Sequence, residues 1–371
     1  MSVDAIRKLV EKLDEQIIES DLGKPFFSRP EYHTYPFDSS NFRPINIVKS
    51  GRKIAFVDGG NQELIGAPNF SVQINRVYFN IFKGNKRLLS NSIPNKMEFF
   101  SATFSRFKNG EIYYDTFILP IREKHFEFLP KEGDLSFSSM DKTLRYGLMR
   151  ADISRVASIA RRFAEWEFAK HVIDNELEEN DIIVRDGSLQ TGETNESKYS
   201  RRAYESAKNK GVIFSGLSKT CSLYTDTGLP LLGAVRKLAE DNDIPYGRWY
   251  YYPVADILSA EHEASIFIVK LHPAAERIFR YEIQRDQVNK LSTDEINEIM
   301  SVLSENCKDV ILPGYPYGLM DADYSARVRD EELEKYKMIF LSEISKLGKW
   351  GKFKKYIQAA DTHDIINMFM G

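Results

Sequence analysis

Residues 54–60 read IAFVDGG, and residues 182–189 read IIVRDGSL. In both stretches a short run of apolar residues leads directly into an Asp-Gly pair, a pattern typical of a strand followed by a turn. We therefore expect one strand to run from Lys53 to Val57 and to end at Asp58. A second strand over residues 181–184 would place Asp186 in the same way. Carboxylates at the carboxyl edge of an α/β sheet lie where such sheets bind ligands.

The residues around these two stretches predict an α/β fold. Residues 70–82 and 112–119 are rich in β-branched and aromatic residues, which indicates further strands. The segment 148–173 contains no Gly or Pro and carries an apolar stripe, so it predicts one long helix. Beyond residue 200, predicted helices and strands alternate. We expect parallel strands flanked by helices, with the early meander making the central sheet mixed.

The first 50 residues predict an N-terminal helix and an extended arm. Residues 3–22 carry apolar side chains at helical spacing, which indicates an amphipathic helix packed on the body of the protein or on a second subunit. Gly23 ends this helix. Residues 51–371 would form one large domain, with a β-rich insertion near residues 84–145.

The composition is that of an ordinary globular protein and excludes several classes. No stretch approaches the roughly 18 consecutive apolar residues of a membrane span, and the start of the chain lacks the pattern of a secretion signal. We expect a cytoplasmic protein without a membrane partner. The net charge of −3 argues against a protein that coats nucleic acid through bulk positive charge, so contact with DNA must be local.

The candidate chemistry rests on carboxylates. Asp58 and Asp186, held close together inside a fold, would repel each other unless a cation neutralised them, and their oxygens suit Mg²⁺ or Mn²⁺. The alternative is that each Asp-Gly pair is only a turn. Glu165 lies beside the apolar stripe of the predicted helix, from which it could reach the sheet edge. Glu167 is the alternative ligand, because the two glutamates are not expected to face the core together. A glutamate on a helix is more often exposed to solvent than bound to a metal.

A strand Asp, a helix Glu and a second strand Asp in this order resemble the ligand pattern of the ribonuclease H-like superfamily. In that pattern two cations activate water and stabilise the leaving oxygen of a phosphodiester. The chain also resembles one particular family, the NurA nucleases, in separate blocks from about Lys53 onward. The blocks are residues 54–60, 182–189, 216–220 (GLSKT) and 312–319 (LPGYPYGL), then Ala322-Asp323 and finally His363-Asp364.

The resemblance implies a ribonuclease H-like mixed central sheet flanked by helices and a homodimer with a central channel. It implies Mn²⁺-dependent (or Mg²⁺-dependent) endonuclease and 5′ to 3′ exonuclease activity on DNA. It also implies partnership with a HerA-type hexameric ATPase, in the repair or resection of DNA ends or in defence. Carried over to this chain, Asp58, Glu165 and Asp186 would be metal ligands, and Tyr315 and Asp323 would be catalytic residues that border the site.

Two features depart from the family pattern. The separation of Asp58 and Asp186 is larger than in compact members, which is why the insertion is placed between them and why Glu167 stays in reserve. Position 323 is Asp where some relatives have His, so this side chain could bind metal or position water. In the block at 216–220, Lys219 could bind a phosphate oxygen of the substrate, or it could be an exposed loop lysine.

Two other functions remain open. An actin-like small-molecule phosphotransferase also begins with a strand that ends in Asp-Gly, but the C-terminal half shows no adenosine-binding glycine block and no Walker A motif. ATP binding without DNA cleavage would favour that function. A catalytically inactive DNA-binding adaptor is the third possibility, although a clamp would not need three carboxylates.

Overall fold

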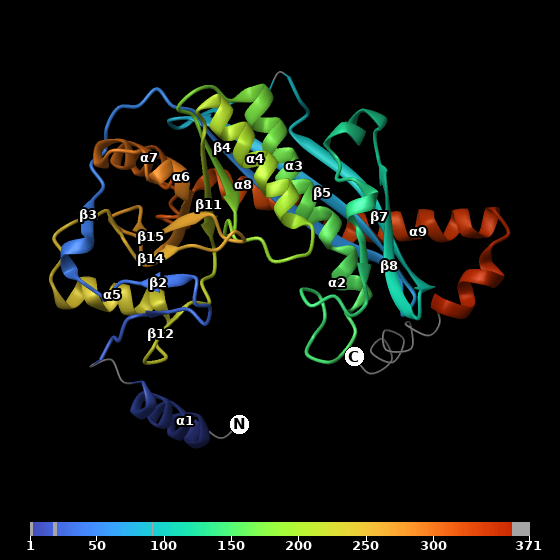
Figure 1. The fold of residues 1–371 in the computed structure, drawn as a ribbon, viewed down its shortest axis with the longest axis horizontal. Helices are drawn as coiled ribbons and strands as arrows, with labels where there is room; N and C mark the ends of the chain where they lie inside the picture. Colours follow the sequence, from blue (N-terminus) through green and yellow to red (C-terminus); the bar gives the residue numbers. More distant parts are fainter. Residues whose placement is uncertain (1–2, 18–20, 91, 358–371) are drawn as a thin grey trace. The chain divides into compact units, whose positions relative to one another are not determined.

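The computed structural model describes residues 3–17, 21–90 and 92–357, and their packing divides the chain into two compact units (Figure 1). Unit 1 consists of residues 1–49, 187–189 and 216–315. Unit 2 consists of residues 50–186, 190–215 and 316–371. Each unit is therefore assembled from segments that are far apart in the sequence.

Unit 2 is built on a mixed sheet with the strand order β9-β8-β7-β5-β4-β10-β11. β4 pairs with β10 in parallel, whereas the meander from β4 through β5 and β7 to β8 is antiparallel. The strands are β4 (Ile54–Ala67), β5 (Phe70–Lys83), β6 (Lys86–Leu88), β7 (Lys96–Lys108), β8 (Glu111–Pro120), β9 (Ser136–Ser138), β10 (Ile182–Asp186) and β11 (Ile213–Ser218), whose last three residues belong to unit 1.

Helices cover both faces of this sheet. Successive residues of a strand point to opposite faces. A side chain at Gly59 would overlap Glu165 on α3, whereas one at Gly60 would overlap the Ala326 carbonyl on α8, so these two helices lie on opposite faces of β4. The helices of unit 2 are α2 (Ile153–Ala157), α3 (Ile159–Glu176), α4 (Glu196–Lys210), α8 (Tyr317–Ala326), α9 (Asp330–Lys346) and residues 350–357, with short 3-10 helices η2 (Glu123–Phe128) and η3 (Glu132–Asp134).

The predicted mixed central sheet flanked by helices is confirmed, but one strand end is wrong. β4 does not stop at Asp58; it continues through Gly59 and Gly60 to Ala67. The two glycines are sites of close approach rather than a turn, because a helix lies against each of them where a Cβ would stand. The second expected strand end is close to the observed one, since β10 ends at Asp186.

The single helix predicted over residues 148–173 is two helices. α2 begins at Ile153 because the Asp152 side chain accepts hydrogen bonds from the backbone N–H groups of Ser154 and Arg155. The chain leaves α2 at Ser158 and enters α3 directly. The apolar stripe continues across this break, which is why the sequence predicted one helix.

Unit 1 contains a smaller antiparallel sheet with the order β3-β13-β15-β16. Its core includes Phe42, Leu231, Trp249 and Ile266. The elements are α1 (Val3–Gln16), β1 (Pro25–Phe26), β2 (Tyr32–Thr34), η1 (Ser39–Asn41), β3 (Phe42–Pro44), β12 (Tyr224–Thr225), α5 (Leu231–Asp241), β13 (Trp249–Tyr251), β14 (Ala255–Ile257), β15 (Ala264–Lys270), β16 (Phe279–Gln284), α6 (Arg285–Val288) and α7 (Thr293–Glu305).

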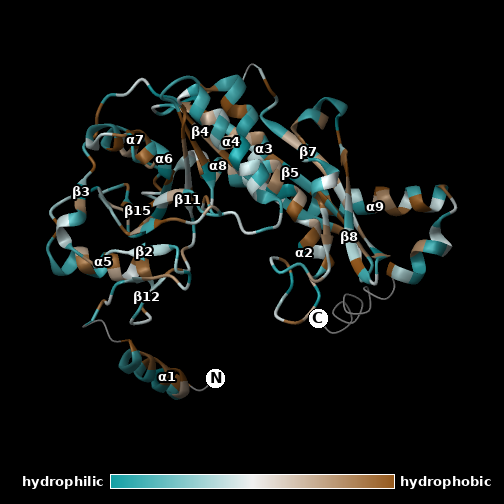
Figure 2. Ribbon diagram, viewed as in Figure 1, coloured by the Kyte–Doolittle hydropathy of each residue, from teal (hydrophilic) through white to brown (hydrophobic). Residues whose placement is uncertain are grey.

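The predicted N-terminal helix is present as α1, and the rest of the prediction, to residue 22, includes residues 18–20, which lie outside the described part. None of residues 3–16 is buried, and Ile6, Leu9 and Val10 are each more than half exposed. Figure 2 shows apolar and polar residues side by side on this helix. Packing of α1 on the body of the protein is therefore not found; packing on a second subunit stays a prediction. No helix among the described residues is long and apolar enough to cross a membrane.

Candidate metal centre

Three carboxylates meet on one face of the unit 2 sheet. Asp58 on β4, Asp186 at the end of β10 and Asp323 on α8 each offer an oxygen, and these oxygens lie within 4.8 Å of one another. Asp58 is buried, and the other two are half-buried. In the part of the chain that the structure describes, no other group of His, Cys, Asp or Glu side chains has metal-binding spacing.

The parallel pairing of β4 and β10 explains why two of these residues meet. Arg185 lies beside Val57 in the register, so the next residues, Asp186 and Asp58, are neighbours. Neighbours on adjacent strands point to the same face of a sheet. α8 lies on that face, because a side chain at Gly318 would overlap the ring of Phe56, two residues before Asp58.

All the ligand atoms that this cluster offers to a metal are carboxylate oxygens. The Gly59 N–H donates to Asp58 Oδ1 at 2.7 Å, and Arg327, one turn later on α8, donates to Asp323 Oδ2 at 3.1 Å. Three like charges at this spacing repel each other, and a divalent cation removes that cost. Carboxylate oxygens without nitrogen or sulfur donors suit Mg²⁺ or Mn²⁺. The residues present therefore fit such a cation.

Glu165 lies on the other face of β4 and is not one of the clustered carboxylates. Its Oε2 accepts a hydrogen bond from Arg185 at 2.7 Å, and its Oε1 accepts one from Arg161, one turn earlier on α3. Its side chain occupies the space that the missing Cβ of Gly59 leaves. The negative charge of Glu165 is therefore balanced by two arginines of the same fold. The assignment of Glu165 as a metal ligand stays a prediction.

Glu167, the reserve ligand, is buried as well. It forms an ion pair with Arg202 on α4, and His171 Nε2 lies 3.7 Å from its Oε1. The expectation that the two glutamates of α3 cannot both face the core is therefore wrong. α3 is buried around most of its circumference, and each carboxylate takes an arginine partner. Such pairing offsets the desolvation of a buried charge.

The remaining predicted site residues belong to other parts of the chain. Tyr315 is buried in unit 1, where its ring lies 5.3 Å from that of Phe279. Lys219, also in unit 1, directly follows β11 and is exposed. Their roles at the site stay predictions. His363-Asp364 lies outside the described residues.

Sequence reasoning missed a buried charge network in unit 1 that holds the loop after Asp186. Glu282 is fully buried and accepts hydrogen bonds from the Leu189 N–H at 2.6 Å and from Arg280 Nε at 2.5 Å. His262 Nε2 lies 3.2 Å from the same carboxylate. Burial raises the pKa of Glu282, but Arg280 and His262 outweigh it and bring the pKa to about 2. The only signal in the sequence was a pair of charged residues inside an otherwise apolar strand.

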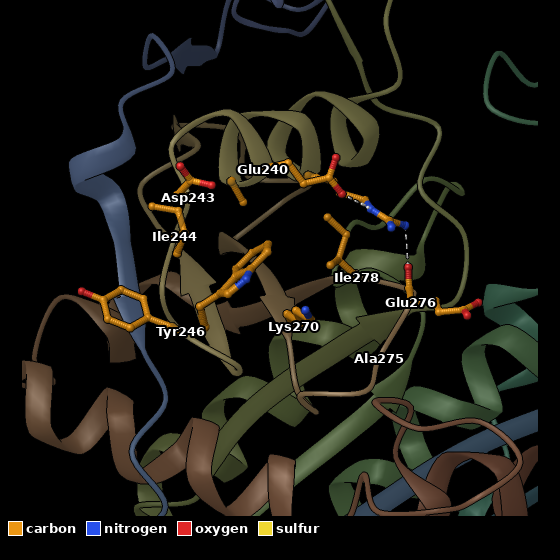
Figure 3. Close-up of a pocket in the computed structure, with 11 residues that line it drawn as sticks. Glu240, Asp243, Ile244, Tyr246, Lys270, Ala275, Glu276 and Ile278 are labelled. Carbon is orange, nitrogen blue, oxygen red and sulfur yellow. Dashed lines mark hydrogen bonds and ion pairs between the residues drawn. The ribbon is translucent and has the colours of Figure 1, made fainter.

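Unit 1 also has an open pocket of about 440 Å³ beside α5 (Figure 3). Arg236 in its wall donates to Glu240 Oε1 at 2.9 Å and to the Glu276 carbonyl at 2.7 Å. The lining is a mixture of charged and apolar side chains: Arg236, Ala239, Glu240, Asp243, Ile244, Tyr246, Trp249, Lys270, Ala275, Glu276 and Ile278. None of the clustered aspartates lines this pocket.

Comparison with known proteins finds similarity at the level of solved structures. No protein-family model and no curated protein matches the chain. The structure is similar to the crystal structure of the NurA nuclease from Sulfolobus solfataricus, with 15% identity and a TM-score of 0.49, over 93% of this chain and 98% of that one. It is also similar to an Argonaute from Aquifex aeolicus, with 9% identity and a TM-score of 0.27, over 74% of this chain and 28% of that one. Neither likeness is close enough to show the activity of this chain.

Proposed function

We propose that the protein is a metal-dependent deoxyribonuclease. The observation that carries this proposal is the meeting of Asp58, Asp186 and Asp323 within 4.8 Å on one face of the sheet. A bound divalent cation would supply an activated water and charge stabilisation for the hydrolysis of a phosphodiester. A group of hard oxygen donors has no comparable use in a protein that only clamps DNA.

The three aspartates would divide the work according to the elements that carry them. Asp58 and Asp186 stand on neighbouring strands, so their carboxylates are rigidly placed and would hold the cation. Asp323 stands on α8 beside Arg327 and would either complete the ligand set or orient the attacking water. Glu165 would join the ligands only by leaving Arg161 and Arg185.

The finer parts of the proposal are supported by the sequence blocks at 54–60, 182–189, 216–220 and 312–319. They are Mn²⁺ or Mg²⁺ as the cation, endonuclease and 5′ to 3′ exonuclease activity, and action with a HerA-type hexameric ATPase in DNA repair, end resection or defence. Tyr315 would border the substrate, and Lys219 would bind one of its phosphate oxygens. A net charge of −3 agrees with a nuclease that needs a partner to hold long duplexes.

Incubation of the purified protein with linear and circular DNA in Mn²⁺, Mg²⁺ or EDTA tests the activity. We expect cleavage with a divalent cation and none in EDTA, and circular DNA separates endonuclease from exonuclease activity. Glu331→Gln is a matched control, because this exposed carboxylate of α9 lies outside the cluster. Cleavage undiminished in EDTA would overturn the proposal. ATP binding without DNA cleavage would favour a phosphotransferase.

We also propose that the protein is a homodimer and that α1 contributes to its interface. The exposed apolar side of α1 supports this proposal, because such a surface is usually covered in solution. Light scattering of the full chain and of a variant lacking residues 3–16 is the measurement. A monomer at micromolar concentration, unchanged by the deletion, would contradict the dimer and leave the metal-site proposal intact.

A further inference from the structure

The last described residues of the chain are basic and aromatic. Residues 346–357 read KLGKWGKFKKYI and hold five lysines and no acidic residue, in a chain whose net charge is −3. After α9 ends, residues 350–357 form a short helix, which follows α9 in red in Figure 1. We call residues 349–357, which are this helix and the lysine directly before it, the basic helix. The first half of α9 has the opposite character, because it begins Asp-Glu-Glu at residues 330–332.

One side of the basic helix is fixed against unit 2. The ring of Phe353 lies 6.1 Å from that of Phe70 at the start of β5 and 6.4 Å from that of Phe340 on α9, both edge to face. Ile357, one turn later, is buried. The apolar side of the helix is therefore occupied by its own domain.

The other side presents ammonium groups and one aromatic ring. Lys349, Lys352 and Lys355 recur at every third residue, so they lie along one side of the helix with about 5–6 Å between successive Cβ atoms. None of the three forms an ion pair with a described residue, and all are exposed. Tyr356, four residues after Lys352, is 46% exposed on the same side. Trp350 is 43% exposed but lies on the side of Phe353 and Ile357, three and seven residues later. Proteins bind single-stranded nucleic acid through cationic side chains that contact its phosphates and aromatic rings on which its bases stack.

A membrane surface is the other partner that a basic amphipathic helix can have. Binding of that kind buries the apolar side of the helix among lipid chains. Here Phe353 already packs on Phe70 and Phe340 and Ile357 is buried, so Trp350 is the only exposed apolar side chain left on that side. The observations therefore favour a nucleic-acid strand.

The basic helix lies near the turn of the β4–β5 hairpin, away from the carboxylates. Phe70 pairs with Ala67, which is nine residues after Asp58 in the same strand. At about 3.3 Å per residue, this separation is about 30 Å along β4. A stacked strand that rises about 3.4 Å per nucleotide covers that distance with about nine nucleotides.

We propose that the basic helix is a second binding site for single-stranded DNA, which holds the substrate about nine nucleotides from the place where it is cut. The distance in this proposal rests on the proposed nuclease function. The binding itself does not, because the lysines and the ring of Tyr356 would hold a strand whether or not the aspartates cut it.

Binding is measured by fluorescence anisotropy on full-length Asp58→Asn protein, with a labelled oligonucleotide of about 20 nucleotides. Replacement of Lys349, Lys352 and Lys355 by Gln should weaken binding and reduce the slope of log affinity against log salt by about 2, since each phosphate contact in a single strand contributes about 0.7. Tyr356→Ala should weaken binding about tenfold through lost stacking. The matched control is Lys335→Gln with Lys337→Gln, an exposed and a half-buried lysine in the acidic half of α9, which should change neither quantity.

An unchanged affinity and salt slope in the triple variant would overturn the proposal. So would a triple variant that loses binding to phosphatidylserine vesicles but keeps its affinity for DNA, because that result would make the surface a membrane site.

Cleavage separates this inference from the proposed function. In an otherwise unaltered protein, the triple variant should raise KM for oligonucleotides of about 30 nucleotides and leave cleavage of those of about six nucleotides unchanged, because only the longer strand reaches the basic helix. An equal loss of cleavage for oligonucleotides of both lengths would overturn the proposal of a separate binding site. If the unaltered protein cuts no DNA, the proposed function fails, and the anisotropy measurement still decides whether the basic helix binds a strand.

Discussion

The two faces of β4 carry buried carboxylates in two different arrangements. On the α3 face, Glu165 lies between two arginines and Glu167 has an arginine of its own, so that each negative charge is kept apart and paired within the fold. On the α8 face, Asp58, Asp186 and Asp323 are gathered within 4.8 Å of one another. The first arrangement stabilises the packing of α3, whereas the second is suited to a cation from solution. A carboxylate's place in the sheet therefore tells more about its role than its burial does.

Removal of a clustered charge should have the largest effect on activity. We expect Asp58→Asn and Asp186→Asn each to reduce cleavage about a thousandfold or more, the loss that follows when several kcal/mol of charge stabilisation is removed. The melting temperature should be unchanged or higher without metal, because one repulsive charge is gone. Cleavage assays and thermal unfolding of the same preparations check both parts. Strong cleavage by Asp58→Asn would contradict the role given to the cluster.

The α3 face is tested by a pair of variants, Glu165→Gln and Glu167→Gln. Glu165→Gln leaves the buried Arg185 without its counter-charge and should lower the free energy of unfolding by about 3 kcal/mol. Glu167→Gln leaves the partly exposed Arg202 without its counter-charge and should lower it less, because solvent screens that pair. If Glu165 is also a ligand, its variant should lose much more activity than the Glu167 variant at equal stability. Urea unfolding and cleavage rates measured at a temperature where both variants are folded give the answer. Equal activities would show that Glu165 serves the fold alone.

Glu282 extends the comparison to unit 1, where a carboxylate is again paired within the fold. Its folded pKa of about 2 lies below the ordinary value of 4.5, so it contributes stability above about pH 4.5 that is lost as the pH falls toward 2. The contribution is about 3 kcal/mol. Urea unfolding between pH 5 and 2, read by tryptophan fluorescence, should show a smaller pH dependence in Glu282→Gln. An identical pH profile in the two proteins would rule out this role.

The smallest expected effect concerns Asp323, which stands on a helix rather than a strand. If it is a ligand, Asp323→His should keep most of the activity and Asp323→Asn should lose about tenfold or more, since imidazole also binds Mn²⁺. If it orients water, both variants should lose activity to a similar degree. Cleavage rates over a range of Mn²⁺ concentrations separate the two, because only loss of a ligand raises the Mn²⁺ requirement.

Local pattern alone predicted much of the fold and two of the three clustered aspartates. Apolar runs before Asp58 and Asp186 indicated two strands, and both are present. Helical spacing indicated α1 and α3. These features are readable because the periods of strand and helix are short, so a few neighbouring residues are enough to reveal them.

Tertiary structure alone decided how these elements meet. Gly59 and Gly60 look like a turn in the sequence, and only the approach of α3 and α8 shows that they are points of close contact within β4. The partner of Glu165 is Arg185 on another strand, so its charge balance depends on strand pairing across many residues. The assembly of each unit from segments that are far apart in the sequence depends on packing in the same way. Sequence patterns report on neighbours along the chain, whereas a metal centre and its counter-charges are made by residues that only folding brings together.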